Sequence, residues 1–201
     1  GQDLVLGGQK SGTVWAMNAD TGEVVWRRDI GTGGPSGGIH WGIAADDTHA
    51  YAPISFPGRD LPDYKVPDDI TPGLYAVNID TGEIDWVFNV EASCDDESKA
   101  FTPRCEMMYG LSGAPSVIGD FVVTGGLDGW LYVLDKTSGE LIWKYQTARA
   151  FETLNGIDGN GGAIDNASIV AANGMLFANS GYGLFGAGAG NVMLAFKPKS
   201  E

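Results

Sequence analysis

The sequence predicts an all-β protein: a β-propeller of about four blades that forms an incomplete ring. Three observations support this fold class: a motif that recurs about every 60 residues, short strand-like runs between turn residues, and a high glycine content. Glycine accounts for 31 of the 201 residues, with no Gly-x-y period. This excludes collagen and indicates many tight turns between short strands.

The repeated motif is an aromatic strand followed by Asn or Asp, then Thr/Ser-Gly-Glu, then apolar residues that end in tryptophan. The three copies are VWAMNADTGEVVW, LYAVNIDTGEIDW and LYVLDKTSGELIW, which end at Trp26, Trp86 and Trp143. Asn or Asp starts a turn and glycine supplies a positive φ, so each copy predicts a hairpin. We expect the three tryptophans to be structural and to pack between neighbouring blades.

The repeat divides the chain into blades at about residues 1–30, 31–90, 105–147 and 160–201. The first blade begins with its second strand (4–7) and lacks an innermost strand, whereas the last blade has three strands (168–171, 175–179, 192–196) and lacks the outermost one. In the third blade we expect the two inner strands over 114–118 and 121–124. Because propeller edges need protection, we expect a larger ring of seven or eight blades. A missing portion or a complementary chain would supply the other blades.

The formal net charge of −14 argues against nucleic acid as a partner, because phosphate binding needs a basic surface. The acidic surface suits a basic protein partner or serves solubility alone. No apolar run approaches the ~20 residues that a transmembrane helix needs. The chain starts at Gly1 in strand-like sequence without a signal peptide, as a mature or truncated chain does.

Two cysteines, Cys94 and Cys105, flank a polar stretch. A disulfide is the simplest interpretation and implies an oxidising compartment; the alternative is two unpaired thiols. Two cysteines are too few for a four-thiolate zinc site, and no Cys-x-x-Cys-His motif is present for c-type haem.

At the motif Ala16-x-Asn18-x-x-Thr21-Gly22-x-x-x-Trp26 and its two later copies, the sequence resembles the quinoprotein (PQQ-dependent) alcohol dehydrogenase superfamily. Non-catalytic relatives, such as the scaffold lipoprotein of outer-membrane protein assembly, share this motif. The blade entrances GGIHWGIAAD, CEMMYGLSGAPSV and FETLNGIDGNGGAIDNAS are more specific, as is the tail NSGYGLFGAGAGNVMLAF. Together they resemble the C-terminal half of polyvinyl-alcohol dehydrogenase-like β-propeller proteins.

The resemblance implies a pyrroloquinoline quinone (PQQ) cofactor, a bound Ca²⁺, oxidation of a small or polymeric alcohol, and a periplasmic or secreted protein. Since this chain carries no haem site, the electrons would pass to a separate cytochrome c or to a missing domain. The competing function is that of a non-catalytic propeller that serves as a protein-binding scaffold. The fold alone does not choose between the two, because function resides in the site.

Each connection from the outermost strand of one blade to the innermost strand of the next brings residues to the mouth of the central channel. In the first connection, Trp41 is expected to stack on a planar cofactor and His40 to contact its carboxylates or the substrate. Alternatively, Trp41 packs between blades. In the second, Arg104 suits the carboxylates of PQQ, with Tyr109 nearby. Alternatively, Arg104 is a surface residue of a solvated loop.

The third connection is rich in glycine and in oxygen-bearing side chains. We expect Asn155 to contact the cofactor, and Asp158 and Asn160 to supply the oxygen ligands that Ca²⁺ prefers. Asp165, at the strand entrance, is the expected general base that takes the alcohol proton. Alternatively, residues 158–161 form only a turn.

Overall fold

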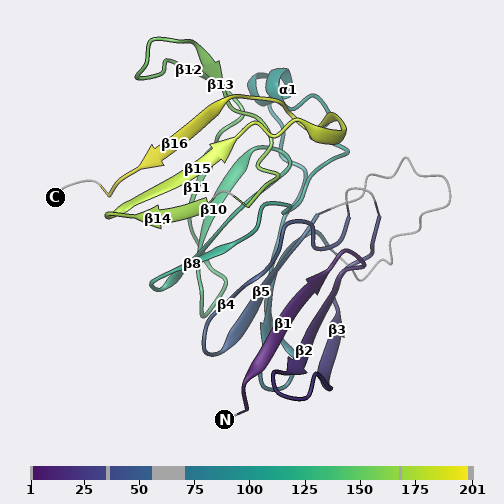
Figure 1. The fold of residues 1–201 in the computed structure, drawn as a ribbon. Coiled ribbons are helices and arrows are strands. Elements are labelled where there is room, and N and C mark those ends of the chain that lie inside the picture. Colours follow the sequence, from purple (N-terminus) through teal and green to yellow (C-terminus); the bar gives the residue numbers. More distant parts are fainter. Residues whose placement is uncertain (1, 35–36, 56–70, 168, 199–201) are drawn as a thin grey trace.

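The computed structural model describes residues 2–34, 37–55, 71–167 and 169–198, which form four antiparallel sheets in chain order (Figure 1). The first sheet contains β1 (Leu4–Gln9), β2 (Thr13–Asn18) and β3 (Val24–Asp29), and the second contains β4 (Ala44–Ala45), β5 (His49–Ile54), β6 (Gly73–Asn78) and β7 (Ile84–Asn89). The third contains β8 (Ser116–Ile118), β9 (Phe121–Gly125), β10 (Trp130–Asp135) and β11 (Leu141–Gln146), and the fourth contains β14 (Ile169–Ala172), β15 (Met175–Ser180) and β16 (Val192–Phe196).

Consecutive strands are neighbours in every one of these sheets, which confirms the predicted propeller architecture. The strands agree closely with the sequence pattern, and β16 has the predicted bounds. Three short elements were not predicted: helix α1 (Asp96–Phe101), the 3-10 helix η1 (Leu184–Gly186), and a separate hairpin of β12 (Ala150–Phe151) and β13 (Gly159–Asn160). No helix among the described residues is long and apolar enough to cross a membrane.

The repeated turn forms for the reason the motif suggests. The Asn18 side-chain oxygen accepts hydrogen bonds from the backbone N–H groups of Asp20 and Thr21, each at 2.8 Å. Gly22 then adopts φ +73°, a conformation that L side chains rarely adopt. Asn78 and Asp135 cap the equivalent turns of the second and third sheets in the same way.

Two of the motif tryptophans connect one sheet to the next. The Trp26 indole N–H donates to the backbone oxygen of Ile79 at 2.7 Å, and its ring lies against Gly82. The Trp86 indole N–H donates to the backbone oxygen of Lys136 at 3.2 Å, and its ring lies against Gly139. Each tryptophan therefore docks on the glycine turn of the following sheet.

Trp143 has a different environment. Its side chain is 38% exposed, and its ring packs against Tyr145 and Phe196, with centroids 5.8 and 5.3 Å away. By strand register, Lys197 occupies the position that Asp135 holds in the third sheet, because Phe196 pairs with Leu176 as Leu134 pairs with Val122. The described part of the fourth sheet therefore lacks the capped turn on which a docking tryptophan rests.

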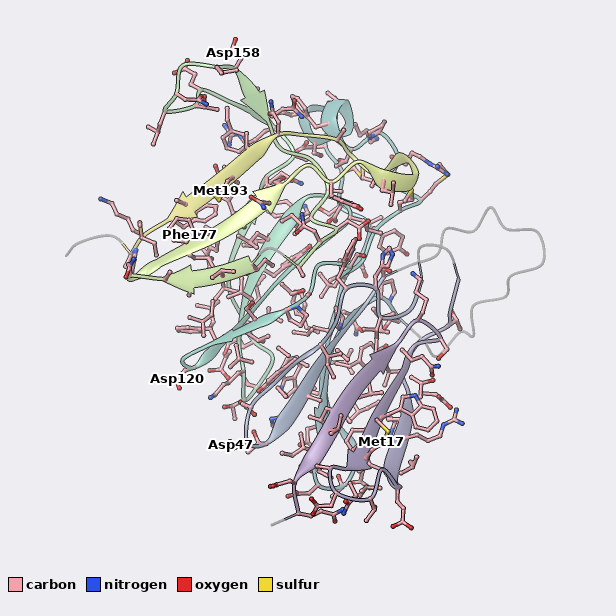
Figure 2. The ribbon with its side chains drawn as sticks, in the orientation of Figure 1. Met17, Asp47, Asp120, Asp158, Phe177 and Met193 are labelled. Carbon is pink, nitrogen blue, oxygen red and sulfur yellow. A yellow bond between two sulfur atoms is a disulfide. The ribbon has the colours of Figure 1, made fainter. Side chains whose placement is uncertain are left out.

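The hydrophobic core is divided into three clusters, one at each junction between neighbouring sheets. Val14 and Val77 belong to the first cluster, Leu74 and Leu134 to the second, and Leu131 and Ile164 to the third. The outward faces of the two end sheets remain apolar and exposed; on the fourth sheet Met193 is 70% exposed (Figure 2). These faces are where further blades of the expected ring would pack.

Cys94 and Cys105 form a disulfide with Cα atoms 6.1 Å apart, which confirms the simpler of the two interpretations. Between them, helix α1 starts with a capping box in which Asp95 and Ser98 satisfy each other's backbone N–H groups. The disulfide closes a short loop that the unfolded chain would otherwise leave open.

Replacing both cysteines by serine is expected to lower the free energy of unfolding by about 3 kcal/mol, since the 11-residue separation sets the loop-closure entropy. Urea unfolding of the double variant, next to the wild type with and without reductant, measures this. An unchanged unfolding midpoint in both comparisons would contradict the expectation.

A candidate site at the blade connectors

The three connectors between sheets contact the segments that join β1 to β2, β9 to β10 and β15 to β16, at one end of the molecule. Backbone hydrogen bonds join them: Gly31 N to Gly12 O at 3.1 Å, Leu127 N to Gly110 O at 3.1 Å, and Ala163 N to Gly188 O at 2.8 Å. Several contacts are too close for side chains; a Cβ on Gly162 would lie 2.2 Å from the Gly188 oxygen. The glycines allow this close backbone packing, so the connector side chains are held on a rigid frame.

The structure brings together one side chain or pair from each connector. Trp41 Nε1 donates to Asp165 Oδ1 at 2.7 Å, and Ser112 Oγ donates to the same oxygen at 2.5 Å. His40 Nδ1 lies 3.0 Å from Ser112 Oγ and 3.3 Å from Asp165 Oδ1. We call His40, Trp41, Ser112 and Asp165 the connector cluster.

The connector cluster keeps the Asp165 carboxyl ionised. Burial on its own raises the pKa of Asp165, but hydrogen bonds from His40, Ser112 and Trp41 lower it, and the net pKa lies below the ordinary value. A carboxylate that accepts several hydrogen bonds is favoured in its charged form. Asp165 is therefore a fixed negative charge at neutral pH.

Two further residues flank the cluster. Lys10, in the turn between β1 and β2, donates to the Gly37 oxygen at 2.9 Å. Partial desolvation lowers the pKa of Lys10, and the negative charge of Asp165 opposes that shift. The Tyr182 ring meets the Trp41 ring edge-on, with centroids 5.4 Å apart. Lys10 thus places a positive charge near the cluster, and Tyr182 supports the indole.

The cluster contains a serine, a histidine and an aspartate, but not in the arrangement of a hydrolytic triad. In a triad the imidazole lies between the other two side chains and uses a different nitrogen for each. Here Ser112 and Asp165 share the Nδ1 side of His40, and Ser112 is fully buried. Ser112 is therefore not positioned as a nucleophile.

A polar hollow adjoins the cluster at Tyr182. It has a volume of about 280 Å³, and Asn166, Asn179 and Asn191 are among the residues that line it. Amide groups both donate and accept hydrogen bonds, so this lining suits a ligand with hydroxyl groups.

The structure places Arg104 and Tyr109 in the second connector but apart from the cluster's hydrogen bonds. Arg104 is exposed and lies over η1, where a Cβ on Gly186 would be 3.1 Å from its Nη1 atom. Tyr109 is half-buried beside Gly110. In the described part of the chain, no hydrogen bond or ion pair joins Arg104 to the connector cluster.

The two residues expected to bind Ca²⁺, Asp158 and Asn160, lie in the β12–β13 hairpin. Asp158 is exposed at the tip of the β12–β13 hairpin (Figure 2), and the Asn160 amide donates to the oxygens of Gly161 and Ala189, both at 2.9 Å. Asn155 accepts a hydrogen bond from Ile157 N within its own loop. Among residues 2–34, 37–55, 71–167 and 169–198, no three acidic, histidine or cysteine side chains group as metal ligands.

Sequence reasoning missed Ser112, Lys10 and Tyr182. Ser112 lies in a stretch without charged or aromatic side chains, so its type gave no signal. Lys10 lies in the turn between β1 and β2, and Tyr182 lies in the connection between β15 and β16. These turns share one end of the molecule with the connectors because strand direction alternates, and that reasoning could have found them.

Asp128 is a second buried carboxyl, in the turn between β9 and β10. Its Oδ1 accepts a hydrogen bond from Trp130 N at 3.4 Å, whereas its Oδ2 has no hydrogen-bond partner. Burial raises the pKa of Asp128 to about 7, although hydrogen bonds and the charge of Lys144 oppose the shift.

Replacing Asp128 by asparagine is expected to stabilise the protein at pH 8 by about 2 kcal/mol, with little effect at pH 4. The folded pKa exceeds the unfolded one, so the folded state holds the proton more tightly and loses stability as pH rises from about 4 to 7. Urea unfolding at both pH values measures the difference. Equal destabilisation at pH 4 and pH 8 would contradict it.

A family model described as outer membrane protein assembly factor BamB, PQQ_2, matches residues 2–194. The chain is 35% identical over 184 residues to polyvinylalcohol dehydrogenase of Sphingopyxis sp. (strain 113P3), covering 90% of this chain and 27% of that protein. It is 31% identical over 206 residues to polyvinylalcohol dehydrogenase of Pseudomonas sp., covering 98% of this chain and 30% of that protein. The chain therefore spans less than a third of the length of these relatives.

Two solved structures share the fold. BamB from Moraxella catarrhalis aligns with a TM-score of 0.59 and 15% identity, covering 96% of this chain and 42% of that one. Quinohemoprotein alcohol dehydrogenase ADHIIG from Pseudomonas putida HK5 aligns with a TM-score of 0.59 and 16% identity, covering 90% of this chain and 27% of that one. Since the family model matches nearly the whole length, the chain belongs to the PQQ_2 family of β-propellers and resembles the PQQ-dependent dehydrogenases over part of their length.

Proposed function

We propose that the protein oxidises an alcohol with PQQ as cofactor, and that this chain supplies part of the catalytic propeller. The connector cluster is the observation that carries the proposal. It joins an exposed indole, an imidazole and an ionised carboxylate at the end of the molecule where all three connectors meet. The relatives named polyvinylalcohol dehydrogenase support an oxidoreductase.

The residues present suit a planar, negatively charged cofactor. The Trp41 side chain is 37% exposed, yet the Asp165 carboxylate and the Tyr182 ring fix its orientation, as a stacking platform requires. Lys10 carries positive charge beside it, and the Arg104 guanidinium suits carboxylates. We propose that Trp41, His40 and Lys10 contact the cofactor, with Arg104, Tyr109 and Asn155 as outer contacts.

When bound, PQQ accepts the hydrogen and two electrons that leave the alcohol carbon. The chain's own residues orient the alcohol and take its hydroxyl proton. Asp165 is part of this proton-accepting apparatus, because its carboxylate is held ionised within the cluster. The amide-lined hollow next to Tyr182 suits the hydroxyl groups of the alcohol, whether small or polymeric.

A Ca²⁺ ion enters the proposal through the resemblance alone. We keep Asp158 and Asn160 as its proposed ligands, because their side-chain oxygens are of the type that Ca²⁺ accepts, and no step is assigned to the ion. We further propose a periplasmic or secreted location and a cytochrome c as electron acceptor. The disulfide agrees with an oxidising compartment.

An assay of the whole protein tests the proposal. Protein freed of cofactor is mixed with PQQ, an alcohol such as polyvinyl alcohol or 1-butanol, and an artificial redox dye. We expect dye reduction only when PQQ and alcohol are both present, and loss of that activity on treatment with a calcium chelator. No PQQ-dependent reduction with either alcohol would refute the proposal.

A scaffold function is the competing proposal, favoured by the family description and by the likeness to BamB. The dye assay separates the two, since a scaffold gives no alcohol-dependent reduction.

A further inference from the structure

We propose that His40 Nε2 is the atom that accepts the alcohol proton, and that Asp165 and Ser112 hold the ring's own proton on Nδ1. This inference rests on the proposed function and names the base of that same site. It differs from the expectation that Asp165 takes the proton directly.

The first step of the argument is access. The Asp165 side chain is 4% exposed and the His40 side chain 18% exposed. Asp165 Oδ1 accepts hydrogen bonds from Ser112 and Trp41 and faces His40 Nδ1. A carboxylate enclosed in this way is a poor contact for a substrate, whereas the more exposed imidazole is open to one.

The second step is the direction of the hydrogen bonds. Ser112 has a single hydroxyl proton, and the ionised carboxylate at 2.5 Å can only accept it. The Ser112 oxygen must then accept from its other neighbour, His40 Nδ1, at 3.0 Å. His40 is thereby fixed as the tautomer with its proton on Nδ1, and Nε2 keeps a free lone pair.

The third step concerns where Nε2 points. Asp128 Oδ2 is the one buried side-chain nitrogen or oxygen without a hydrogen bond among the described residues. His40 Nε2 also forms no hydrogen bond among the described residues. Because Nε2 is not a second fully buried atom without a partner, it is in contact with solvent. A basic nitrogen with a lone pair therefore opens toward the connector end of the molecule.

In the proton step, the alcohol O–H bond breaks and an Nε2–H bond forms. The electron pair stays on oxygen and becomes part of the carbonyl bond as hydrogen leaves the carbon, with its electron pair, for the quinone. The resulting imidazolium is stabilised by the negative charge of Asp165, 3.3 Å from Nδ1, and by the Ser112 oxygen that accepts from Nδ1. Within the described ranges, Lys10 also interacts electrostatically with Asp165, and the Tyr182 ring contacts the Trp41 ring.

Activity measurements on the whole protein test the role of His40. His40→Ala is expected to lower kcat at least a hundred-fold. Added imidazole is expected to raise the kcat of this variant at least ten-fold. His49→Ala is the matched control, because His49 pairs with Asp85 away from the connector cluster, and its kcat should remain within two-fold. His40→Ala with wild-type kcat, while the wild type oxidises alcohol with PQQ, would overturn the inference and leave the proposed function intact.

A second readout does not depend on activity. Nitrogen-15 NMR of the two histidines, assigned with His49→Ala, reports which ring nitrogen carries the proton. We expect His40 as the Nδ1–H tautomer in the wild type, and also in Ser112→Ala, because Asp165 Oδ1 still lies 3.3 Å from Nδ1. We expect a shift toward the Nε2–H tautomer only when Ser112→Ala is combined with Asp165→Leu, which removes both acceptors. A wild-type His40 protonated on Nε2 when neutral would overturn the inference even if no alcohol is oxidised.

Discussion

Replacing Asp165 by asparagine in the whole protein is expected to lower kcat for alcohol oxidation by about a hundred-fold or more, a magnitude typical of acid–base catalysis. The amide preserves the size of the side chain but removes the negative charge. That charge lies on the carboxylate whose Oδ1 accepts hydrogen bonds from Trp41 and Ser112 and lies near His40. Steady-state kinetics with saturating PQQ measures the change. A kcat within three-fold of wild type would exclude Asp165 from the proton-accepting apparatus.

The matched control is Asp120→Asn, which makes the same chemical change at the other end of the sheets. Asp120 is exposed in the turn between β8 and β9, far from the β12–β13 hairpin that marks the connector end (Figure 2). It should leave kcat unchanged.

Asp165→Asn should also alter the dependence of stability on pH. The folded pKa of Asp165 lies below its unfolded value of about 3.9, so its carboxylate stabilises the fold above that value. Wild type loses this contribution as pH falls through the folded pKa, and the variant has none to lose. Urea unfolding of wild type and Asp165→Asn from pH 7 to pH 2 should therefore show their free energies of unfolding approaching each other at low pH.

The second large effect concerns the glycine turns that receive tryptophans. In the 201-residue chain, Gly139→Ala and Gly82→Ala are each expected to lower the free energy of unfolding by about 3 kcal/mol. Both glycines have a positive φ, of 73° and 71°, and a Cβ there would lie 2.5 Å from the Trp86 ring and 2.7 Å from the Trp26 ring. The change therefore combines backbone strain with loss of the tryptophan contact.

Gly22→Ala separates these two contributions. Gly22 has the same φ of 73°, but nothing lies within 4 Å of a Cβ added there. We expect a loss of about 1 kcal/mol from backbone strain alone. Urea unfolding of the three variants measures the difference, and equal losses would show that the tryptophan contact contributes nothing.

The fold could be predicted in detail because the repeat encodes local structure. Asn18, Gly22 and Trp26 act within or next to one hairpin, and their spacing recurs with the same turn and the same docking partner. Blade order and strand bounds follow from such local signals. Helix α1 was not predicted because its capping box, Asp95 with Ser98, lies in a six-residue helix too short for a periodic pattern.

The candidate site could be predicted only in part. The expectation that the connectors converge was useful, and His40, Trp41 and Asp165 do lie together. The link between them is Ser112, a residue 72 positions from His40 and 53 from Asp165, and no local pattern encodes that contact. Asp158 fits Ca²⁺ by residue type, but no local pattern encodes which further oxygen ligands would lie near it.

The most direct test is the absorbance and fluorescence spectrum of the whole protein, purified from its native source, before and after removal of Ca²⁺. The account predicts a bound quinone spectrum that is lost from the wild type on Ca²⁺ removal, and weaker PQQ binding in Trp41→Ala, because the indole is the proposed stacking platform. Absence of a quinone spectrum, even after reconstitution with PQQ and Ca²⁺, would contradict the account and favour a binding propeller.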